Sequence, residues 1–305
     1  MSGKPKKRNI NLHEVFNFLK KKEFHLIEIN QEWRHVVARG DYKGRKVVFK
    51  MASTQKTGKM TQNEFYWNEM VHKTPEKERI YFTVPRNLES GFFGKLFYLI
   101  TEEFSNKLIE RDSKDTSKIK ENLKKITEAA FEIRCLNVFQ SSNFYQSQAS
   151  KEFRVGERLL ESAIFWAKQA EVNLDKFINI IEKMKDRIRS STGHGDFVPR
   201  QLYEVHGKIG IIDGEHAGIA GALYYDPAWF YLRLRLDHDA KELARAFLLE
   251  YKNLLNKKDR ENFWDELKPV LTQRFIGEIW GAGRKSKKIN EILNIGKDIL
   301  GGNII

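Results

Sequence analysis

The chain has a single cysteine, Cys135, and no uninterrupted apolar stretch long enough to cross a bilayer. One cysteine cannot form an internal disulfide, so we expect a reducing, intracellular compartment. Cys135 lies in the apolar-periodic run 119–136, which favours a buried structural thiol over a nucleophile. No apolar segment of the secretory kind follows the basic N-terminus, so we expect a cytoplasmic protein.

The chain also lacks internal repeats, and its only biased segment is a basic stretch at residues 1–10, which predicts a flexible tail. With 305 residues, of which 41% are hydrophobic, it is long enough for two lobes with separate cores. The net charge of +13 extends well beyond the tail. Such a surface favours anionic partners, namely nucleotide phosphates, phosphosugars, nucleic acid or a membrane surface, although solubility alone also explains scattered lysines.

Hydrophobic periodicity divides the chain into two regions that differ in predicted secondary structure. The first is strand-rich: we predict helices at 11–24 and 61–72 and strands at 24–30, 35–39, 46–51, 80–84 and 96–101. The second is helical: apolar stripes or patterns cover 119–133, 174–188, 239–255, 260–275 and 288–300. We place the boundary between the regions at residues 102–105.

Two carboxylates in tight turns carry the clearest chemical signal. Asp196 lies in the run His-Gly-Asp-Phe-Val-Pro-Arg-Gln at 194–201, and Asp213 follows an apolar strand in Gly-Ile-Ile-Asp-Gly-Glu at 210–215. Between them, the turn 206–208 separates two short apolar strands and predicts a hairpin that brings both turns together. Phosphoryl transfer needs such a set: one Asp to orient the acceptor hydroxyl, and a second Asp with an amide oxygen, here Gln201, to hold Mg²⁺.

These motifs resemble the His-Gly-Asp-x-x-x-x-Asn and Ile-Asp-x-x motifs of aminoglycoside phosphotransferases, choline kinases and related small-molecule kinases. The resemblance implies an α+β, protein-kinase-like bilobal fold. Residues 11–103 would form an N-lobe, a five-stranded antiparallel sheet with one inserted helix. Residues 104–305 would form a mainly helical C-lobe that contains the catalytic loop and the metal-binding turn. It also implies an enzyme that uses Mg²⁺ and moves the γ-phosphate of ATP or GTP to a hydroxyl of a small molecule.

Four residues receive roles in or near the transfer step from this resemblance. Asp196 would orient the acceptor hydroxyl and take its proton. Asp213 would be the main Mg²⁺ ligand, assisted by the amide of Gln201. His194 is expected to hold the catalytic loop by hydrogen bonding rather than to act as an acid or base. Glu215 and His216, in the same turn as Asp213, are either supporting residues or ordinary turn residues.

The nucleotide would lie between the lobes. Lys50, at the end of a strand, would contact the α- and β-phosphates, held there by Glu64 of the following helix. Glu69 is the alternative partner, because residues five apart lie about 140° apart around a helix and only one faces the cleft. Around the lobe boundary, Glu102 and Phe104 belong to the segment expected to offer backbone groups to the base, adenine or guanine.

Two departures from the family pattern leave a second class of function open. Gln201 stands where Asn is usual, and residues 31–34 replace a Gly-rich loop. A catalytically weak or inactive nucleotide-binding module that holds an anionic partner, such as nucleic acid, is therefore the alternative to an enzyme. The retained trio of Lys50, Asp196 and Asp213 favours the enzyme. A basic strip interleaved with aromatic residues would favour nucleic acid, and the sequence shows no such strip.

The positive charge also bears on the acceptor. Aminoglycosides are polycations, whereas this chain carries +13 and places Arg200 inside the catalytic loop. We therefore expect a neutral or anionic acceptor. Its binding surface should be formed by the C-lobe helices and their loops, including the loops 140–151 and 223–230. The sequence does not predict the oligomeric state.

Overall fold

The computed structural model describes residues 10–148, 154–170, 172–282 and 289–304. The basic tail predicted at 1–10 lies outside these ranges except for Ile10, and residues 149–151 of the predicted acceptor surface also lie outside them. Among the helices in the described ranges, none is both long enough and apolar enough to cross a membrane.

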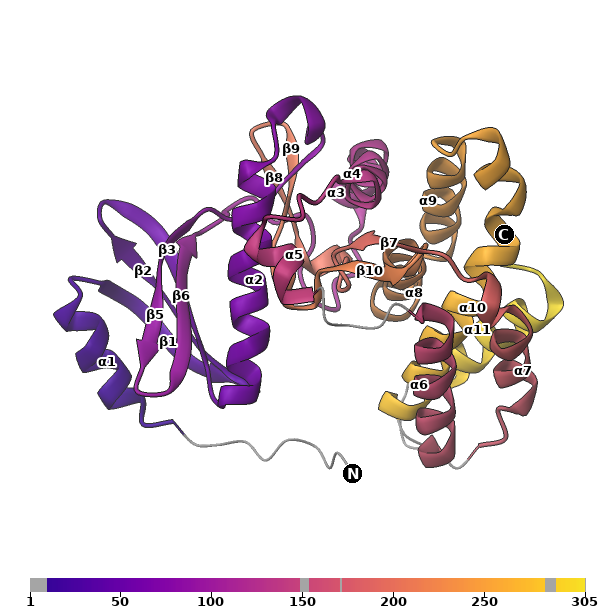
Figure 1. The fold of residues 1–305 in the computed structure, drawn as a ribbon, viewed down its shortest axis with the longest axis horizontal. Coiled ribbons are helices and arrows are strands. Elements are labelled where there is room, and N and C mark those ends of the chain that lie inside the picture. Colours follow the sequence, from indigo (N-terminus) through magenta and orange to yellow (C-terminus); the bar gives the residue numbers. More distant parts are fainter. Residues whose placement is uncertain (1–9, 149–153, 171, 283–288, 305) are drawn as a thin grey trace.

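The N-terminal region is an antiparallel sheet with one helix on each face (Figure 1). In spatial order its strands are β1 (His25–Glu32), β2 (His35–Tyr42), β3 (Arg45–Ala52), β6 (Leu96–Glu102) and β5 (Asn87–Phe93). Helix α1 (Leu12–Lys21) packs on the outer face, and α2 (Gln55–Lys73) covers the face toward the rest of the molecule. The predicted five-stranded antiparallel sheet with one inserted helix is confirmed.

Two details of that prediction were wrong. The predicted strand 80–84 is reduced to β4 (Phe82–Thr83), which pairs in parallel with β9 (Lys208–Ile211) and not with the N-terminal sheet. The fifth strand of the sheet is instead β5, which the sequence analysis missed. Its sequence, Asn-Leu-Glu-Ser-Gly-Phe-Phe, has no β-branched residue and no alternation of apolar and polar side chains, so the usual strand signals are absent.

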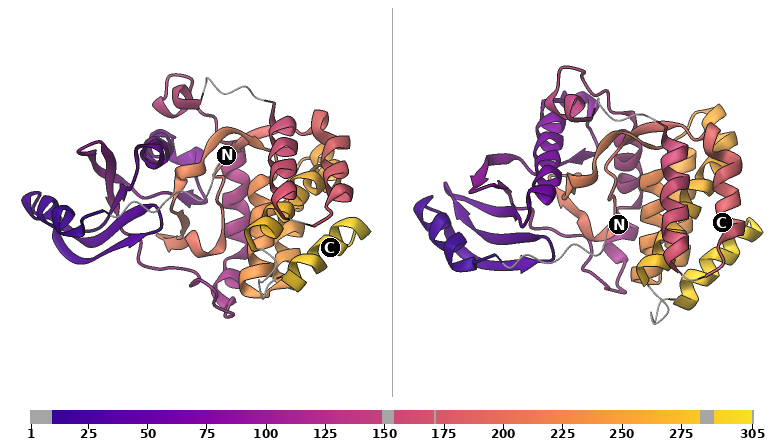
Figure 2. Two further views of the ribbon diagram at one scale, coloured as in Figure 1. Left: turned by 90° about the horizontal axis from the view of Figure 1, so that it is seen from below. Right: turned by 60° about the horizontal axis from the view of Figure 1, so that its bottom comes forward.

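The C-terminal region is mainly helical, as predicted (Figures 1 and 2). Its helices are α3 (Ser117–Glu121), α4 (Leu123–Cys135), α5 (Asn143–Gln148), α6 (Val155–Ala170), α7 (Asp175–Met184), α8 (Tyr225–His238), α9 (Lys241–Asn253), α10 (Lys257–Ala282) and α11 (Ile289–Gly301). Its short strands are β7 (Ser190–Gly193) paired with β10 (Gly218–Ala222), and β8 (Leu202–Val205) paired with β9. Its short 3-10 turns are η2 (Lys185–Arg187), η3 (Pro199–Gln201) and η4 (Gly214–His216), whereas η1 (Glu76–Glu78) lies earlier, between α2 and β4.

Helix α8 was missed because it is buried on nearly every side. Eleven of its residues are buried, among them Asp226 and Arg235, so its sequence shows no polar face from which a helical period could be read. The region expected to be a loop at 223–230 therefore contains the first turns of this helix. Several of the residues that form the candidate site come from it.

Two hydrophobic cores lie on either side of α2. The smaller one joins α1 to the N-terminal sheet and includes Val15, Phe49 and Tyr98. The larger one fills the helical region and includes Trp67 of α2. Helix α2 packs on the sheet with one face and contributes to the larger core with another. It therefore joins the two regions, and the candidate site lies between them. The lobe boundary at 102–105 follows the end of β6 and remains a prediction.

Cys135 does not lie in the core. Its side chain is exposed at the C-terminal end of α4, where Ile133 and Leu136 are the buried residues. The predicted buried thiol is therefore wrong, because the apolar stripe of α4 passes beside this position and not through it.

Candidate active site

The β8–β9 hairpin brings the two carboxylate motifs together. Its turn is His206-Gly207, with positive φ at both residues (48° and 79°), as a two-residue turn between twisted strands requires. Leu202 is paired with Ile211, and the Ile212 N–H donates to the Gln201 carbonyl at 3.3 Å. The end of the catalytic loop thus lies beside the start of the second turn, as the sequence predicts.

The catalytic loop is held through its backbone. Asp226, the second residue of α8, accepts hydrogen bonds from the N–H groups of His194 (2.7 Å) and Gly195 (2.8 Å). Gly195 has φ of +75°, and a Cβ atom there would lie 2.3 Å from the carbonyl oxygen of His216. Only glycine therefore fits this position, which sets the direction of the next residue, Asp196.

The imidazole of His194 does not make the hydrogen bonds expected of it. The ring is fully buried, neither nitrogen has a hydrogen-bond partner among the described residues, and it packs edge-on against Trp67. Burial lowers the pKa of His194, which keeps the ring neutral. The predicted hydrogen bonding by the ring is therefore wrong: the ring packs against Trp67, and the backbone N–H groups of the loop make the hydrogen bonds to Asp226.

Both oxygens of the Asp196 carboxylate are held. The indole N–H of Trp229, on α8, donates to Oδ1 at 2.8 Å, and the amide of Gln201 donates to Oδ2 at 2.9 Å. Arg200 lies further away, with its Nη2 3.8 Å from Oδ2. Sequence reasoning missed Trp229, because an aromatic residue 33 positions away in a buried helix carries no motif.

Gln201 bridges the two predicted functional carboxylates. Its Nε2 also donates to Oδ2 of Asp213 at 3.0 Å, while its Oε1 is buried with no hydrogen-bond partner in the described chain. Asp213 adopts the left-handed conformation (φ 70°), an uncommon one that Asp tolerates better than most residues. Its carboxylate therefore has one oxygen toward Gln201 and the other, Oδ1, toward Lys50.

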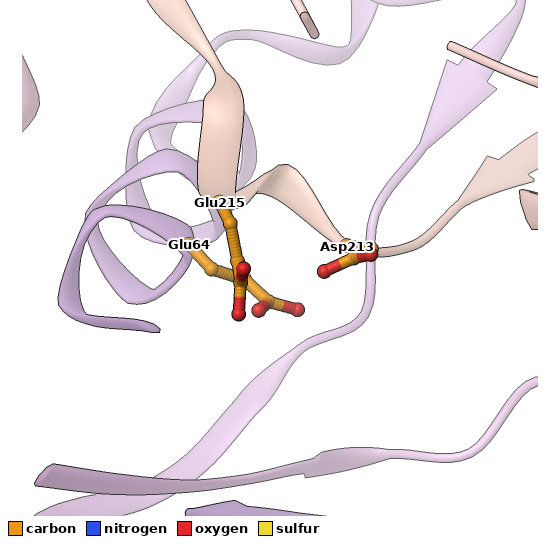
Figure 3. A group of neighbouring side chains, drawn as sticks. All are labelled: Glu64, Asp213 and Glu215. Atoms are coloured by element: carbon orange, nitrogen blue, oxygen red, sulfur yellow. The ribbon is translucent and has the colours of Figure 1, made fainter. Parts of the chain in front are cut away.

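Lys50 is surrounded by three carboxylates. Its Nζ lies 2.7 Å from Glu64, 2.6 Å from Asp213 and 2.9 Å from Glu215. Figure 3 shows these carboxylates gathered from α2 and from the turn after β9. Glu69 instead accepts a hydrogen bond from Asn87, so the structure pairs Lys50 with the predicted first choice, Glu64.

Glu215 is a full member of this cluster. Besides Lys50, its buried carboxylate contacts Arg34 (2.7 Å), from the β1–β2 turn, and His35 (2.7 Å), from β2. The preceding Gly214 is packed so closely that a Cβ would lie 2.4 Å from the Trp67 ring. The turn that carries Asp213 is therefore held at Glu215 by basic side chains and at Gly214 by packing.

The charged groups of the cluster shift one another's pKa values. Burial raises the pKa values of Asp213 and Glu215, but the combined effect of Lys50 and, for Glu215, of His35 and Arg34 outweighs burial and leaves both pKa values below their usual range. Burial and repulsion from the other two carboxylates raise the pKa of Glu64 above its usual range, against the attraction of Lys50. Burial lowers the pKa of His35, so the imidazole adds no charge at neutral pH.

Oxygen donors for a hard cation converge between Asp196, Gln201 and Asp213. The amide of Gln201 presents its nitrogen to both carboxylates, and a half-turn of its terminal torsion would present the partnerless oxygen to the same place. The residues therefore fit Mg²⁺. The carboxylates of Glu64, Asp213 and Glu215 lie within 4.8 Å of one another, but the Lys50 ammonium already contacts all three.

A cavity of about 1030 Å³ opens beside Asp196, between α2, α6, α8 and α10. Tyr66 of α2, Arg158 of α6 and Arg274 of α10 are among its lining residues. The predicted base-binding residues, Glu102 and Phe104, line a separate cavity of about 600 Å³ at the link between the regions. There the Glu102 carboxylate accepts a hydrogen bond from the Arg86 N–H at 2.9 Å.

Comparison with known proteins identifies the fold. No protein-family model and no curated protein sequence matches the chain. Among solved structures, aminoglycoside 2'-phosphotransferase-IIIa in complex with GDP matches with a TM-score of 0.65 at 13% identity, over 97% of this chain and 100% of that one. A thermostable mutant of aminoglycoside phosphotransferase APH(4)-Ia, in ternary complex with AMP-PNP and hygromycin B, matches with 0.64 at 14% identity, over 95% of each chain.

The choline kinase LicA from Streptococcus pneumoniae matches with a TM-score of 0.57 at 14% identity, over 95% of this chain and 99% of that one. All three matches extend over nearly the whole of both chains, so both regions of the molecule share in the likeness. The chain thus has the α+β, protein-kinase-like fold of the aminoglycoside phosphotransferases and choline kinase, the family that its motifs resemble.

Proposed function

We propose that the protein is a phosphotransferase that moves the γ-phosphate of ATP or GTP to a hydroxyl of a small, neutral or anionic molecule. One observation carries the proposal. Asp196 lines a cavity large enough for a small molecule and is joined through the Gln201 amide to Asp213, which in turn contacts Lys50. A hydroxyl-orienting carboxylate, a metal-binding carboxylate and a phosphate-binding lysine thus form one connected set.

Asp196 would act on the acceptor. With its oxygens oriented by Trp229 and Gln201, it accepts a hydrogen bond from the acceptor hydroxyl and takes the proton as that oxygen bonds to the γ-phosphorus. The bond from the γ-phosphorus to the bridging oxygen breaks, and the nucleoside diphosphate leaves with that oxygen. The products are a phosphate monoester and ADP or GDP.

Asp213 and Gln201 would hold Mg²⁺, which neutralises phosphate charge when bound. Lys50, held by Glu64, would contact the α- and β-phosphates. Arg34 adds a second positive charge from the β1–β2 turn, the place where a Gly-rich loop is absent. Base contacts from the segment with Glu102 and Phe104 remain part of the proposal, and the structure favours neither adenine nor guanine.

A purified sample tests the proposal directly. Nucleotide turnover is measured against a panel of sugars, sugar phosphates, nucleosides, choline and aminoglycosides, with Mg²⁺ present and then removed by chelation. We expect acceptor-dependent formation of ADP or GDP that is lost without Mg²⁺. Mg²⁺-dependent nucleotide binding without transfer to any acceptor would instead support the non-catalytic binding module.

A further inference from the structure

We propose that the cavity beside Asp196 recognises a hydroxyl-bearing acceptor that also carries an oxyanion, a phosphate or a carboxylate, and that Arg274 binds this group with Arg158 assisting at the rim. The inference rests on the proposed function, because it identifies the cavity as the acceptor site. It narrows the acceptor from neutral or anionic to anionic.

The charges that line the cavity are unbalanced. Its lining includes four cationic side chains, Arg34, Lys59, Arg158 and Arg274, of which Arg34 is paired with Glu215. Within the described lining the only carboxylates are Asp196 and Glu215. Glu215 is already ion-paired with Lys50 and Arg34, and Asp196 is reserved for the reacting hydroxyl. A polycation in this cavity would find no carboxylate to offset the cost of removing its ammonium groups from water.

Arg274 is built into the wall as a desolvated cation. Its side chain is 15% exposed, and its guanidinium lies over the Trp229 ring, 3.6 Å from the centroid. Its nearest carboxylate oxygen, from Glu278, is 3.9 Å away, and the other oxygen of that carboxylate is paired with Arg233. Nη1 donates to the Tyr225 hydroxyl at 2.9 Å, while the buried Nε has no partner in the part of the chain that the structure describes.

A guanidinium so placed keeps N–H donors and most of its charge for a ligand. Its planar fork matches the oxygens of phosphate or carboxylate, and hydrogen bonds to charged groups are stronger where water is excluded. Arg158 is more exposed, and its Nη2 donates to the Ala220 carbonyl at 3.0 Å, which directs its head toward the same cavity.

Gln273 lies next to Arg274 in the cavity wall and is held by the protein itself. It is 95% buried, and its Nε2 donates to the Ser162 hydroxyl at 2.9 Å. Its Oε1 is buried beneath the cavity surface and has no hydrogen-bond partner among the described residues. The group that this part of the wall offers to a ligand is therefore the Arg274 guanidinium.

Arg274 also connects the acceptor to the reacting carboxylate. The Trp229 ring on which it lies is the ring whose N–H donates to Asp196. Arg233 lies near the same ring, 4.2 Å from its centroid. An oxyanion bound by Arg274 would hold the guanidinium against the Trp229 indole. The indole, held in place, would in turn keep the Asp196 carboxylate oriented toward the acceptor hydroxyl. Loss of Arg274 should therefore lower acceptor affinity most, with a smaller effect on turnover of every acceptor.

The test compares acceptors that share a five-carbon hydroxylated chain and differ in charge. Ribose, ribonate and ribose 5-phosphate are each offered to the wild type and to the Arg274→Gln and Arg158→Gln variants, and kcat and KM are measured separately. Lys168→Gln is the matched control, because Lys168 is an exposed residue of α6 outside the cavity lining. Thermal melting of each variant shows whether it is folded.

We expect kcat/KM for at least one anion to exceed that for ribose by about tenfold or more, which corresponds to about 1.4 kcal/mol. Arg274→Gln should remove this preference mainly through KM, Arg158→Gln should weaken it, and Lys168→Gln should keep it. The relative rates with ribonate and ribose 5-phosphate identify the oxyanion. Equal use of ribose and both anions, or a preference that survives Arg274→Gln, would overturn the inference.

Calorimetric binding separates failure of this inference from failure of the proposed function. If no acceptor is phosphorylated, binding of ribose 5-phosphate or ribonate that is absent for ribose and abolished by Arg274→Gln would still support the oxyanion site. Binding of neither anion would overturn it.

Discussion

The two sides of Asp196 differ in the sign of their charge. On the Lys50 side, three carboxylates, two of them buried, face two cations, Lys50 and Arg34, so formal negative charge is in excess. On the cavity side, Lys59, Arg158 and Arg274 line the wall, and no carboxylate of the described lining is left unengaged. The two sides lie next to each other but suit opposite ligands.

This difference matches the two halves of a phosphoryl transfer. A divalent cation favours the side with excess carboxylate, and it arrives with a nucleotide whose phosphates need Lys50 and Arg34. The cavity side favours an acceptor with negative charge. Gln201 and Trp229 lie on the boundary, because each donates a hydrogen bond to Asp196. Gln201 also contacts Asp213 on the Lys50 side, and Trp229 also contacts Arg274 on the cavity side. The predictions below act on one side, on the boundary, or far from both.

Asp213→Ala should have the largest effect. It removes the carboxylate that contacts both Lys50 and Gln201 and leaves the Lys50 side without its proposed metal ligand. We expect Mg²⁺-dependent nucleotide affinity to fall by more than the roughly 10–100-fold typical of residues that only support metal ligands. Nucleotide binding titrated with and without Mg²⁺ checks this. Unchanged Mg²⁺ dependence would show that the metal is not held by Asp213.

Trp229→Phe should act on the boundary. The ring remains but the N–H that orients Asp196 is lost, and a hydrogen bond to a charged group contributes about 1.5–3 kcal/mol. We expect kcat to fall by about tenfold or more while nucleotide KM stays within about twofold. Trp264→Phe, at a ring of α10 that packs against Phe263, is the control and should leave kcat unchanged. Equal losses in both variants would mean that ring packing, and not the indole N–H, matters.

Gln201→Asn should change activity less than the substitutions above and should not lower it. It places the amide one methylene closer to the backbone, which is the usual reach of the residue at this position in the family that the motif resembles. We expect activity to be preserved or raised in steady-state assays. A decrease of about tenfold or more, equivalent to about 1.4 kcal/mol, would show that the longer amide is required by this site.

Glu89→Gln should change stability without touching either side of the site. Partial burial raises the pKa of Glu89, but hydrogen bonds from Lys22, Tyr42 and Tyr98 outweigh it and lower the pKa from 4.5 to about 2. A lowered pKa in the folded state stabilises the protein above the unfolded pKa, and this contribution is lost as the pH falls from about 4.5 to about 2.

We therefore expect Glu89→Gln to lower the free energy of unfolding by about 2 kcal/mol at pH 7, after allowance for solvent screening. The difference from the wild type should shrink between pH 4.5 and pH 3 in denaturant titrations. A constant difference over that range would contradict the assigned pKa. Activity at pH 7 should be unchanged, so the variant is also a control for the site substitutions.

The sequence predicted the parts of the fold that depend on local patterns. The β8–β9 hairpin was predictable because two apolar strands flank a turn whose residues accept positive φ. Helices such as α7 and α9 were predictable from their apolar stripes. Strand β5 was not, because its pairing with β6 and not its local pattern determines it, and helix α8 was not, because it is buried on nearly every side.

The same division applies to the site. Lys50, Glu64, Asp196 and Asp213 lie in motifs or at expected places in elements, so they could be singled out. Trp229, Arg274 and the buried role of Glu215 arise from contacts between elements distant in the sequence. His194 shows the limit most clearly: the sequence indicated a structural role, but only the packing showed that its ring makes no hydrogen bonds within the described chain.

Asp196→Asn, with nucleotide binding and phosphate transfer measured on the same sample, tests the central claim most directly. Asn keeps the size of the side chain but cannot take the proton of the acceptor hydroxyl, a function that contributes about 10²–10⁴-fold. We predict Mg²⁺-dependent nucleotide affinity within about threefold of the wild type, and a loss of transfer of that order. Transfer at the wild-type rate would contradict the assignment of Asp196 as the residue between the two sides that acts on the acceptor.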